Sequence, residues 1–480
     1  MNIVTYFIAL IIFLFQIASA LHALFYKKDP RAAWVWIIVC LMLPPIGPIL
    51  YFLFGINRVK LKAKKIRWFW PDVINNDLEF PHNKDNIYNS SYRYFVIPPD
   101  FHQIAKISDS ISKFPLVSDN NVDVLYNGDD AYPSMIYQIN HAKESVFLQT
   151  YIFERRKIGK QFVDALKDAK QRGVDVRVIV DGIGEWYSYP TIGPYLRKNN
   201  IPFTRFLPPR IYPFSPLINL RNHRKILVVD GKVAFTGGIN IRDKHIISQY
   251  KKRNKIQDVH FKLTGPIVGQ LEQIFIDDWL FCTGEKIKKR RSLPEPKGEA
   301  ICRCITVGPD DDLNSLTILL VGAISLAKEY IYIMTPYFLP NREIIGALQS
   351  AALRGVDVRI ILPEKNNIPY VHWATRNMLW ELLMYGVKIY FQPPPFCHSK
   401  IFVLDGFYSL IGSANLDYRS LRLNFELVVE TFCKKLATKL TSHISKTVQK
   451  SREITLHEVD SRPFLEKLRD SVCWLFTPYL

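Results

Sequence analysis

The sequence from His223 to Asp230 reads HRKILVVD, and the sequence from His398 to Asp405 reads HSKIFVLD. Both stretches place a lysine two positions after the histidine, then four apolar residues and an aspartate. A second apolar run and a turn of small residues follow each stretch, and these turns contain Gly237, Gly238 and Asn240 in the first copy and Gly412, Ser413 and Asn415 in the second. Two matches of this length are not expected by chance, so the chain carries a duplicated unit.

The sequence around the two motifs repeats as well. An identical pentapeptide, GVDVR, stands at residues 173–177 and 355–359. In each copy a run typical of a buried strand (146–153 and 331–338) comes first, then an amphipathic stretch of helical period that ends at the glycine. This order of strand, helix, glycine and strand predicts a β-α-β unit in each half.

The repeat predicts an α/β fold with two pseudo-symmetric lobes, each with a mixed or parallel sheet flanked by helices, and one site that takes a motif from each lobe. The length of 480 residues is enough for two such lobes and an appendage. We divide the chain into a membrane hairpin (1–57), a basic linker and lead-in (58–120), a first lobe (121–290) and a second lobe (298–480).

The amino-terminal segment predicts membrane helices at about residues 3–25 and 32–55. The first run has no charged residue and is long enough to cross a bilayer as a helix. Pro44, Pro45 and Pro48 should interrupt the second run, so a re-entrant hairpin is the alternative to a second full span.

Basic residues follow the second apolar run: Arg58, Lys60, Lys62, Lys64, Lys65 and Arg67. Basic flanks favour the cytoplasmic side, so we predict a multi-pass protein of the cell's inner or plasma membrane whose body faces the cytoplasm together with Met1. The formal net charge of +19 favours anionic partners, either lipid surfaces or nucleic acid.

The paired motifs suit phosphodiester chemistry. Histidine and lysine two apart on a strand point to the same side and can address one phosphate. One histidine would attack phosphorus to give a phosphohistidine, while the other would protonate the leaving alkoxide. Lys225 and Lys400 would stabilise the phosphate oxygens, so this mechanism needs neither a metal nor a cofactor.

Other residues have two readings in the sequence. Asp230 and Asp405 could orient a histidine or serve in the core, and the glycine turns should let backbone amides approach the phosphate, with Asn240 and Asn415 fixing a loop or donating to an oxygen. The segment Trp186–Leu220 could be a lid or membrane-contacting loop, or a packed aromatic cover. The terminal run from Trp474 to Phe476 could touch lipid or pack. The seven cysteines lack zinc-site spacing, and we predict reduced thiols.

The motifs closely resemble those of the phospholipase D superfamily, and the whole arrangement resembles bacterial cardiolipin synthases. The resemblance extends to Asn222, Thr236, Ile239 and the stretch ANLDYRS at 414–420. It implies condensation of two phosphatidylglycerol molecules to cardiolipin and glycerol without metal or nucleotide. The catalytic residues would be His223, Lys225, Asp230, His398, Lys400 and Asp405, with His223 as nucleophile, although the opposite assignment stays open. Glu426 would be a supporting acid, and the substrate-binding residues would be Gly237, Gly238, Asn240, Gly412, Ser413, Asn415 and Glu426.

Three alternatives remain at this stage. A related enzyme could use another acceptor, such as phosphatidylethanolamine, or could hydrolyse its lipid. A nuclease would suit the positive charge, but the apolar hairpin argues against nucleic acid as the partner. A non-catalytic lipid-binding protein would keep the hairpin without turnover. The sequence does not indicate the oligomeric state.

Overall fold

The computed structural model describes residues 3–27, 30–55, 96–209, 220–248, 255–287, 298–308 and 314–477. Two compact units make up the chain, Met1–Trp68 and Phe69–Leu480. The predicted basic cluster between Arg58 and Arg67 lies outside the described residues, as do most of the predicted lead-in and residues 288–297 of the predicted lobe boundary.

The first unit is built on one long apolar helix, α1 (Ile3–Tyr26). Its 24 residues include no Asp, Glu, Lys or Arg, and among the described helices it alone is long and apolar enough to cross a membrane. At about 1.5 Å per residue it extends roughly 36 Å, which exceeds a hydrocarbon core of about 30 Å.

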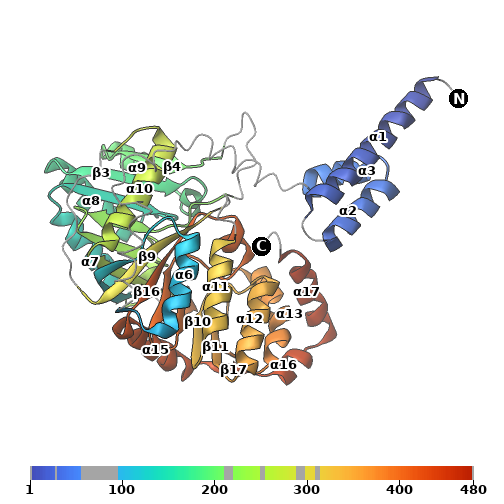
Figure 1. Ribbon diagram of the computed structural model, residues 1–480. Helices are drawn as coiled ribbons and strands as arrows, with labels where there is room; N and C mark the ends of the chain where they lie inside the picture. Colours follow the sequence, from blue (N-terminus) through green and yellow to red (C-terminus); the bar gives the residue numbers. More distant parts are fainter. Residues whose placement is uncertain are drawn as a thin grey trace, which may run out of the picture. The chain divides into compact units, whose positions relative to one another are not determined.

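The second apolar run folds back on itself alongside α1 (Figure 1). Helix α2 (Pro30–Met42) stops before the two prolines, and the chain continues as α3 (Ile46–Leu50) and a π-helical turn, η1 (Tyr51–Gly55). Gln16 in the middle of α1 donates to the carbonyl of Leu41 at 2.9 Å, whereas Lys27 after α1 donates to the carbonyl of Gly55 at 2.5 Å.

Both ends of the second run therefore lie at the carboxyl end of α1. The 13 residues of α2 cover only about 20 Å, too short for a span. This arrangement matches the re-entrant alternative and differs from the predicted second full span at 32–55. The physical reason is the Pro44–Pro45 pair, because proline lacks the N–H that would continue the helix.

The second unit contains a mixed sheet with 15 described strands. The strands of the first lobe are β1 (Val117–Tyr126), β2 (Ser145–Thr150), β3 (Asp175–Asp181), β4 (Phe203–Phe206), β5 (Ile226–Val229), β6 (Val233–Gly237) and β8 (Val259–Thr264). Those of the second lobe are β9 (Ala300–Val307), β10 (Tyr330–Met334), β11 (Asp357–Pro363), β12 (Lys388–Gln392), β14 (Ile401–Leu404), β15 (Tyr408–Gly412), β16 (Glu426–Phe432) and β17 (Arg452–Ile454).

The two lobes have the same strand order. The first runs β1-β8-β6-β5-β2-β3-β4, and the second runs β9-β16-β15-β14-β10-β11-β12 before its extra edge strand β17. Strands β1 and β9 pair antiparallel, with Asn120 opposite Ala300, so the two half-sheets form one continuous sheet. The predicted fold class of two pseudo-symmetric α/β lobes is confirmed, and the pseudo-twofold axis lies near this central pair.

Helices cover both faces of the sheet (Figure 1). Those of the first lobe are α7 (Asn127–Asn140), α8 (Lys157–Gln171), α9 (Gly193–Lys198) and α10 (Ile267–Thr283). Those that pack on the second lobe are α6 (His102–Ile111), α11 (Ser315–Leu326), α12 (Arg342–Leu353), α13 (Pro369–Leu383), α14 (Tyr418–Arg422), α15 (Lys434–Val448), α16 (Leu456–Asp460) and α17 (Phe464–Leu475). Gly173 and Gly355 follow α8 and α12 with φ of +86° and +88°, the left-handed conformation that ends a helix.

Helix α6 precedes the first lobe in sequence but packs on the second. Its Ile104 and Ala105 belong to the second lobe's core. Arg303 of β9, which is 1% exposed, donates to Asp109 of α6 at 2.6 Å and to Glu430 of β16 at 2.9 Å. Helix α6 of the lead-in is therefore an integral part of the second lobe, whereas β1 of the first lobe already begins at Val117.

Candidate active site

Each motif histidine is held by a main-chain pairing with the other lobe. The N–H of His223 donates to the carbonyl of Phe425 at 2.9 Å, and the N–H of His398 donates to the carbonyl of Gln257 at 2.7 Å. Just before His398, the short strands β13 (Phe396–Cys397) and β7 (Ile256–Gln257) pair in parallel. A segment of each lobe therefore pairs with the motif of the other lobe, and both motifs contribute to one site.

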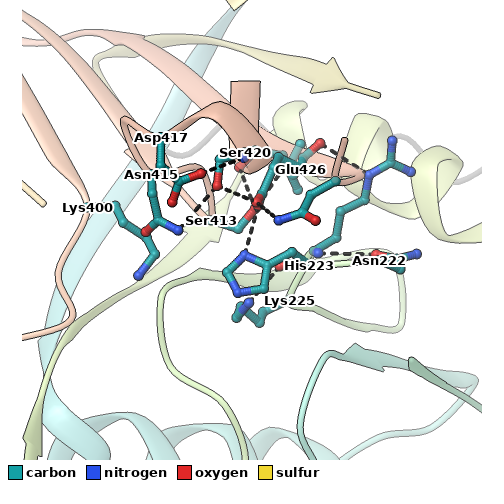
Figure 2. Close-up of polar contacts among 12 residues, drawn as sticks. Asn222, His223, Lys225, Lys400, Ser413, Asn415, Asp417, Ser420 and Glu426 are labelled. Carbon is teal, nitrogen blue, oxygen red and sulfur yellow. Dashed lines mark hydrogen bonds and ion pairs between the residues drawn. The ribbon is translucent and has the colours of Figure 1, made fainter. Parts of the chain in front are cut away.

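Buried carboxylates lie against Nδ1 of both histidines. His223 Nδ1 lies 3.0 Å from Oε2 of Glu426 (Figure 2). His398 Nδ1 lies 2.8 Å from Oδ2 of Asp258, and the two carboxylate residues are 0% and 2% exposed. Both pairs cross between the lobes. Because a carboxylate occupies Nδ1, Nε2 is the ring nitrogen left for chemistry.

Glu426 and Asp258 stand at equivalent positions in the two repeats. Gly412 pairs with Val428 in the sheet, and Glu426 lies two residues before Val428. In the same way Gly237 pairs with His260, and Asp258 lies two residues before His260. The sequence resemblance found Glu426, but sequence reasoning missed Asp258. The signal that could have found it is an acidic residue at the start of the strand after the glycine turn.

Glu426 is the centre of a hydrogen-bonded network (Figure 2). Ser413 Oγ donates to its Oε2 at 2.6 Å, and Ser420 Oγ and Asn424 Nδ2 donate to its Oε1 at 2.9 and 3.2 Å. Ser420 comes from α14, whose first turn is capped by Asp417. With His223, four donors therefore surround this carboxylate, which favours its ionised form.

The surroundings of Asp258 are different. The residue equivalent to Ser413 is Gly238, where an added Cβ would lie 2.3 Å from Oδ1 of Asp258. Glycine is the residue that leaves room for the carboxylate at this point. The difference between the Gly-Gly turn of the first motif and the Gly-Ser turn of the second thus has a structural cause. Gly238 leaves room for the carboxylate of Asp258, whereas Ser413 donates a hydrogen bond to Glu426.

Lys225 and Lys400 are buried beside their own histidines. Lys225 Nζ donates to the carbonyl of His223 at 2.6 Å. Lys400 Nζ donates to the carbonyl of His398 at 2.5 Å and lies 3.0 Å from its Nδ1. Burial lowers the pKa of Lys225 to about 7 and also lowers the pKa of Lys400. A phosphate between them would favour both ammonium forms.

Burial also lowers the pKa of both histidines. For His223 the neighbouring Glu426 opposes this effect, whereas the pKa of His398 lies well below its usual value because Lys400 and Lys225 act with burial. Burial would raise the pKa of Glu426, but the nearby positive charges of His223 and Lys225 outweigh it and the pKa is lowered. The pKa of Asp258 is raised by burial. The site therefore favours an incoming anion.

The motif aspartates contact backbone instead of histidine. Asp230 accepts the N–H groups of residues 143, 144 and 145 at 2.9, 2.7 and 2.9 Å. Asp405 accepts those of residues 328, 329 and 330 at 2.8, 2.9 and 2.8 Å. Of the two roles that the sequence left open, the structure gives both residues the structural one, because the carboxylates on the histidines are Glu426 and Asp258.

The glycine turns also differ from the prediction that their amides would approach phosphate. The N–H groups of Gly238 and Ser413 donate to the carbonyls of Val259 and Leu427 at 3.3 and 2.9 Å, within the sheet. Gly237 and Gly412 have φ of +146° and +152°, and added Cβ atoms would press on the neighbouring strand, 2.9 Å from Val259 O and 2.2 Å from Leu427 O. These glycines therefore permit close strand packing.

The two motif asparagines fix the loops beside the site. Asn240 Oδ1 accepts the N–H of Ile152 at 3.2 Å, and Asn415 Nδ2 donates to Ser420 Oγ at 3.2 Å. Asn415 Oδ1 is buried and has no hydrogen-bond partner among the residues that the structure describes. Of the predicted binding residues, Glu426 contacts a histidine directly, and Ser413 reaches the same carboxylate.

Arg224, between the first histidine and lysine, points to the opposite side of the strand. Its Nη1 donates to Oδ1 of Asp278 in α10 at 2.7 Å, and its Nε donates to the carbonyl of Glu426 at 3.2 Å. Asn222 and Gln149 donate to the other oxygen of Asp278 at 3.0 and 2.6 Å. This buried network ties the first motif to the main chain that carries Glu426.

Tyrosine rings pack beside both histidines. The ring centroids of Tyr151 and His223 are 5.0 Å apart, and those of Tyr337 and His398 are 6.3 Å apart. Tyr187, which is 58% exposed, lies 5.8 Å from Tyr151 and belongs to the predicted lid or cover segment. Residues 210–219 of that segment lie outside the described part of the chain.

Across the described ranges, no cluster of three or more His, Cys, Asp or Glu side chains could hold a metal ion. The seven cysteines are free thiols, and burial raises the pKa of Cys397, the cysteine next to a motif histidine. A buried thiol with a raised pKa is a poor nucleophile. Cys397 is therefore a poor candidate for the nucleophile of this site.

Comparison with known proteins agrees with this geometry. Residues 135–279 and 320–448 match the family described as "Cardiolipin synthase, PLD-like domain", and each matched segment contains one motif. The chain belongs to this cardiolipin synthase family of the phospholipase D superfamily. Residues 7–55 match a second family, "Phospholipase_D-nuclease N-terminal", which covers most of the described part of the first unit.

Relatives of this family align over nearly the whole chain. The major cardiolipin synthase ClsA of Bacillus subtilis is 31% identical over 487 residues, 98% of each chain, and the cardiolipin synthase of Geobacillus kaustophilus is 31% identical over 464 residues, 95% of this chain and 90% of its own. A phosphatidylserine synthase of Haemophilus influenzae shares the fold, with a TM-score of 0.62 over 78% of this chain and all of its own at 15% identity. The chain is thus a phospholipid phosphatidyltransferase of the phospholipase D superfamily.

Proposed function

We propose that this protein condenses two phosphatidylglycerol molecules into cardiolipin and glycerol through a phosphohistidine intermediate. The observation that carries the proposal is the pair of buried histidines, each with a carboxylate on Nδ1 and a buried lysine beside it. Two such imidazoles can exchange the roles of nucleophile and proton carrier. Family membership supports the choice of phosphatidylglycerol as substrate.

In the first step, His223 Nε2 forms a bond to the phosphorus of one phosphatidylglycerol as the bond from phosphorus to the glycerol headgroup oxygen breaks. The protonated His398 gives its proton to that oxygen, and glycerol leaves. Lys225 and Lys400 stabilise the charge on the non-bridging oxygens. The assignment of His223 as nucleophile rests on Glu426, since an ionised carboxylate on Nδ1 raises the electron density at Nε2.

In the second step, the headgroup hydroxyl of another phosphatidylglycerol attacks phosphorus. His398 takes the hydroxyl proton, the new phosphorus–oxygen bond forms, and the bond from phosphorus to His223 breaks. The products are cardiolipin and the restored site. The lowered pKa of His398 keeps its imidazole unprotonated after the first step, so the ring is free to take the hydroxyl proton.

Membrane phospholipids are thus the proposed partners, in the cell's inner or plasma membrane with the catalytic unit toward the cytoplasm. The basic residues between Arg58 and Arg67 support that side. Asp230 and Asp405 support the fold in this mechanism and do not touch the phosphate.

The test is product analysis with purified protein and labelled phosphatidylglycerol as the sole substrate. Cardiolipin and glycerol in equal amounts are expected, and phosphatidic acid alone would contradict the synthase and point to hydrolysis. His223→Ala should abolish product. In wild-type protein quenched during turnover, mass spectrometry should find the phosphatidyl group on the peptide that contains His223, whereas an adduct on another residue would overturn the assignment.

A further inference from the structure

The carboxy-terminal helix α17 exposes its apolar side. Six large apolar residues in a row of helical spacing are exposed: Phe464 (76%), Leu465 (75%), Leu468 (49%), Val472 (46%), Leu475 (67%) and Phe476 (56%). At 100° per residue these positions fill one arc of about 120°. An amphipathic helix on a water-soluble surface would turn this arc toward the core.

The inward side of α17 is charged and fixed to α13. Arg376 of α13 donates to Glu466 at 2.6 Å and lies 3.3 Å from Asp470, and Asp470 also accepts from Arg462 at 2.5 Å. Asp470 is fully buried, and Ser471 Oγ donates to Asn377 at 3.0 Å. Three polar contacts to α13 therefore set the rotation of α17, so its outward apolar arc is a built feature of the fold.

Basic residues flank the arc. On a helical projection Arg469 lies about 20° beyond one edge, and Lys467 lies about 60° beyond the other, past Ser471. Arg469 lies over the ring of Trp373, 4.5 Å from its centroid, and also donates to Asp470 at 2.8 Å. An apolar stripe with basic borders fits an anionic lipid surface, in which the stripe enters the acyl boundary and the cations meet the headgroups.

We propose that α17 is a membrane-docking helix that lies in the plane of an anionic bilayer with the residues of its exposed arc immersed. A lipid surface is chosen over a protein partner because basic residues flank the arc, the chain carries a net charge of +19, and α1 is long and apolar enough to cross a bilayer. This inference rests on the proposed function, since docking holds the catalytic unit at the surface that contains its lipid substrates.

Leu468→Glu combined with Val472→Glu in the full chain tests the docking. The matched control is Leu353→Glu combined with Tyr137→Glu, which adds the same charge at apolar side chains that are 69% and 57% exposed on other helices. In vesicles of phosphatidylglycerol and phosphatidylethanolamine, the α17 variant should form cardiolipin on the order of tenfold more slowly than the wild type. In mixed detergent micelles, where substrate comes to the protein, both variants should keep wild-type rates. Equal rates of the wild type and the α17 variant in vesicles would overturn the proposal.

A second measurement needs no turnover. Wild-type protein in vesicles that contain a photoactivatable phosphatidylglycerol should be labelled on the tryptic peptide that begins at Asp470, and the α17 variant should lose that label. Label on α1 with none on α17 would overturn the docking, as would cross-links from α17 to a second copy of the chain or to the first unit. If the wild type makes no cardiolipin but α17 is still labelled, the proposed function fails while the docking stands.

Discussion

At the scale of single residues, the site couples each histidine to a carboxylate from the other lobe. The carboxylate of Asp258 lies close to Gly238 and contacts His398, whereas the carboxylate of Glu426 is surrounded by four hydrogen-bond donors. The two half-sites therefore share a layout and differ in charge. This difference is the basis for giving the two histidines different first roles, although their motifs are alike.

Asp258→Asn should lower kcat by about 10²–10³-fold, because His398 would lose the acceptor that fixes its tautomer. Glu426→Gln should reduce the rate by a similar factor. Initial rates of cardiolipin formation over a range of pH would measure both effects. Asp277→Asn is the matched control, since burial already raises the pKa of Asp277 to about 6 and its contact is with Gln273. A wild-type rate for Asp258→Asn would exclude it as a positioning residue.

Lys225→Met should abolish transfer but stabilise the fold. Burial lowers the pKa of Lys225 from 10.5 to about 7, so the unfolded chain binds more protons at this site between those values and stability rises with pH there. The cost of burying the ammonium is fully present below pH 7 and absent above 10.5. After the lost hydrogen bond to His223 is allowed for, a net gain of about 1–3 kcal/mol is expected at pH 6.

Thermal unfolding of wild type and Lys225→Met at pH 6 and pH 9.5 would measure this effect. The increase in the melting temperature should be larger at pH 6. Lys262→Met is a control at a partly exposed lysine on β8, and its effect should not depend on pH in this range. A Lys225→Met protein that is less stable than wild type at pH 6 would contradict the expected cost of burial.

The sequence was sufficient to find the histidines and lysines of the site. Each set stands directly before one strand, β5 or β14, whose apolar residues anchor it in the sheet. Asp258 could not be found this way. The segment between Asn240 and Asp258 is longer than the segment between Asn415 and Glu426, so the sequence repeat loses its register there, and only the pairing of β6 with β8 restores it.

At the scale of elements, each motif aspartate joins the end of one strand to the start of another. Asp230 follows β5 with a φ of +53°, and its carboxylate binds the three N–H groups at the start of β2. Asp405 does the same between β14 and β10 with a φ of +46°. The motif thus contains both the proposed catalytic pair and the aspartate that holds its strand in the sheet.

Asp230→Ala should destabilise the protein by about 2–4 kcal/mol, because three N–H groups lose their acceptor. The rate of cardiolipin formation per folded molecule should stay within about twofold of wild type, since the carboxylate touches no catalytic group. Asp230→Asn keeps one acceptor oxygen and tolerates the positive φ, so it should lose less stability. Thermal unfolding and folded-fraction-corrected rates would test both, and an inactive but folded Asp230→Ala would argue for a catalytic aspartate.

The carboxyl ends of α8 and α12 followed from helical periodicity and glycine, but the fold of the membrane segment did not. An apolar run of 24 residues from Ala32 to Gly55 has the composition of a span whether it is straight or folded back. The deciding interactions are tertiary: Gln16 donates to the carbonyl of Leu41, and Lys27 donates to that of Gly55. A local sequence pattern does not predict such long-range contacts. The prolines predicted only that the second helix would be interrupted.

At the scale of the whole molecule, the sequence duplication becomes one continuous sheet. The repeat predicted two lobes, yet it contained no sign that β1 and β9 would pair, because each strand opens its own repeat. The pairing fixes the lobes in one unit, and the short segments before β8 and β16 then reach across to the opposite histidine. A site made of two halves needs this rigidity, since misplacement by about 1 Å costs catalysis heavily.

The fold of the first unit predicts a membrane topology that differs from the one expected of two full spans. If α1 is the single span, Ile3 and the catalytic unit lie on opposite sides of the membrane, instead of on the same side as two full spans require. The basic residues Lys27, Lys28 and Arg31 and those from Arg58 to Arg67 would all lie on the cytoplasmic side. One span with every flanking cation on one side obeys the positive-inside rule better than the hairpin did.

Cysteine labelling in intact cells would test this topology. Ile3→Cys should react with a membrane-impermeant maleimide added outside, above the background of the native thiols. Gln171→Cys, an exposed position on α8, should react only after the membrane is permeabilised. Labelling of both positions under the same condition would contradict the single span, because a re-entrant hairpin whose two ends meet at Lys27 cannot return the chain to the side on which Ile3 lies.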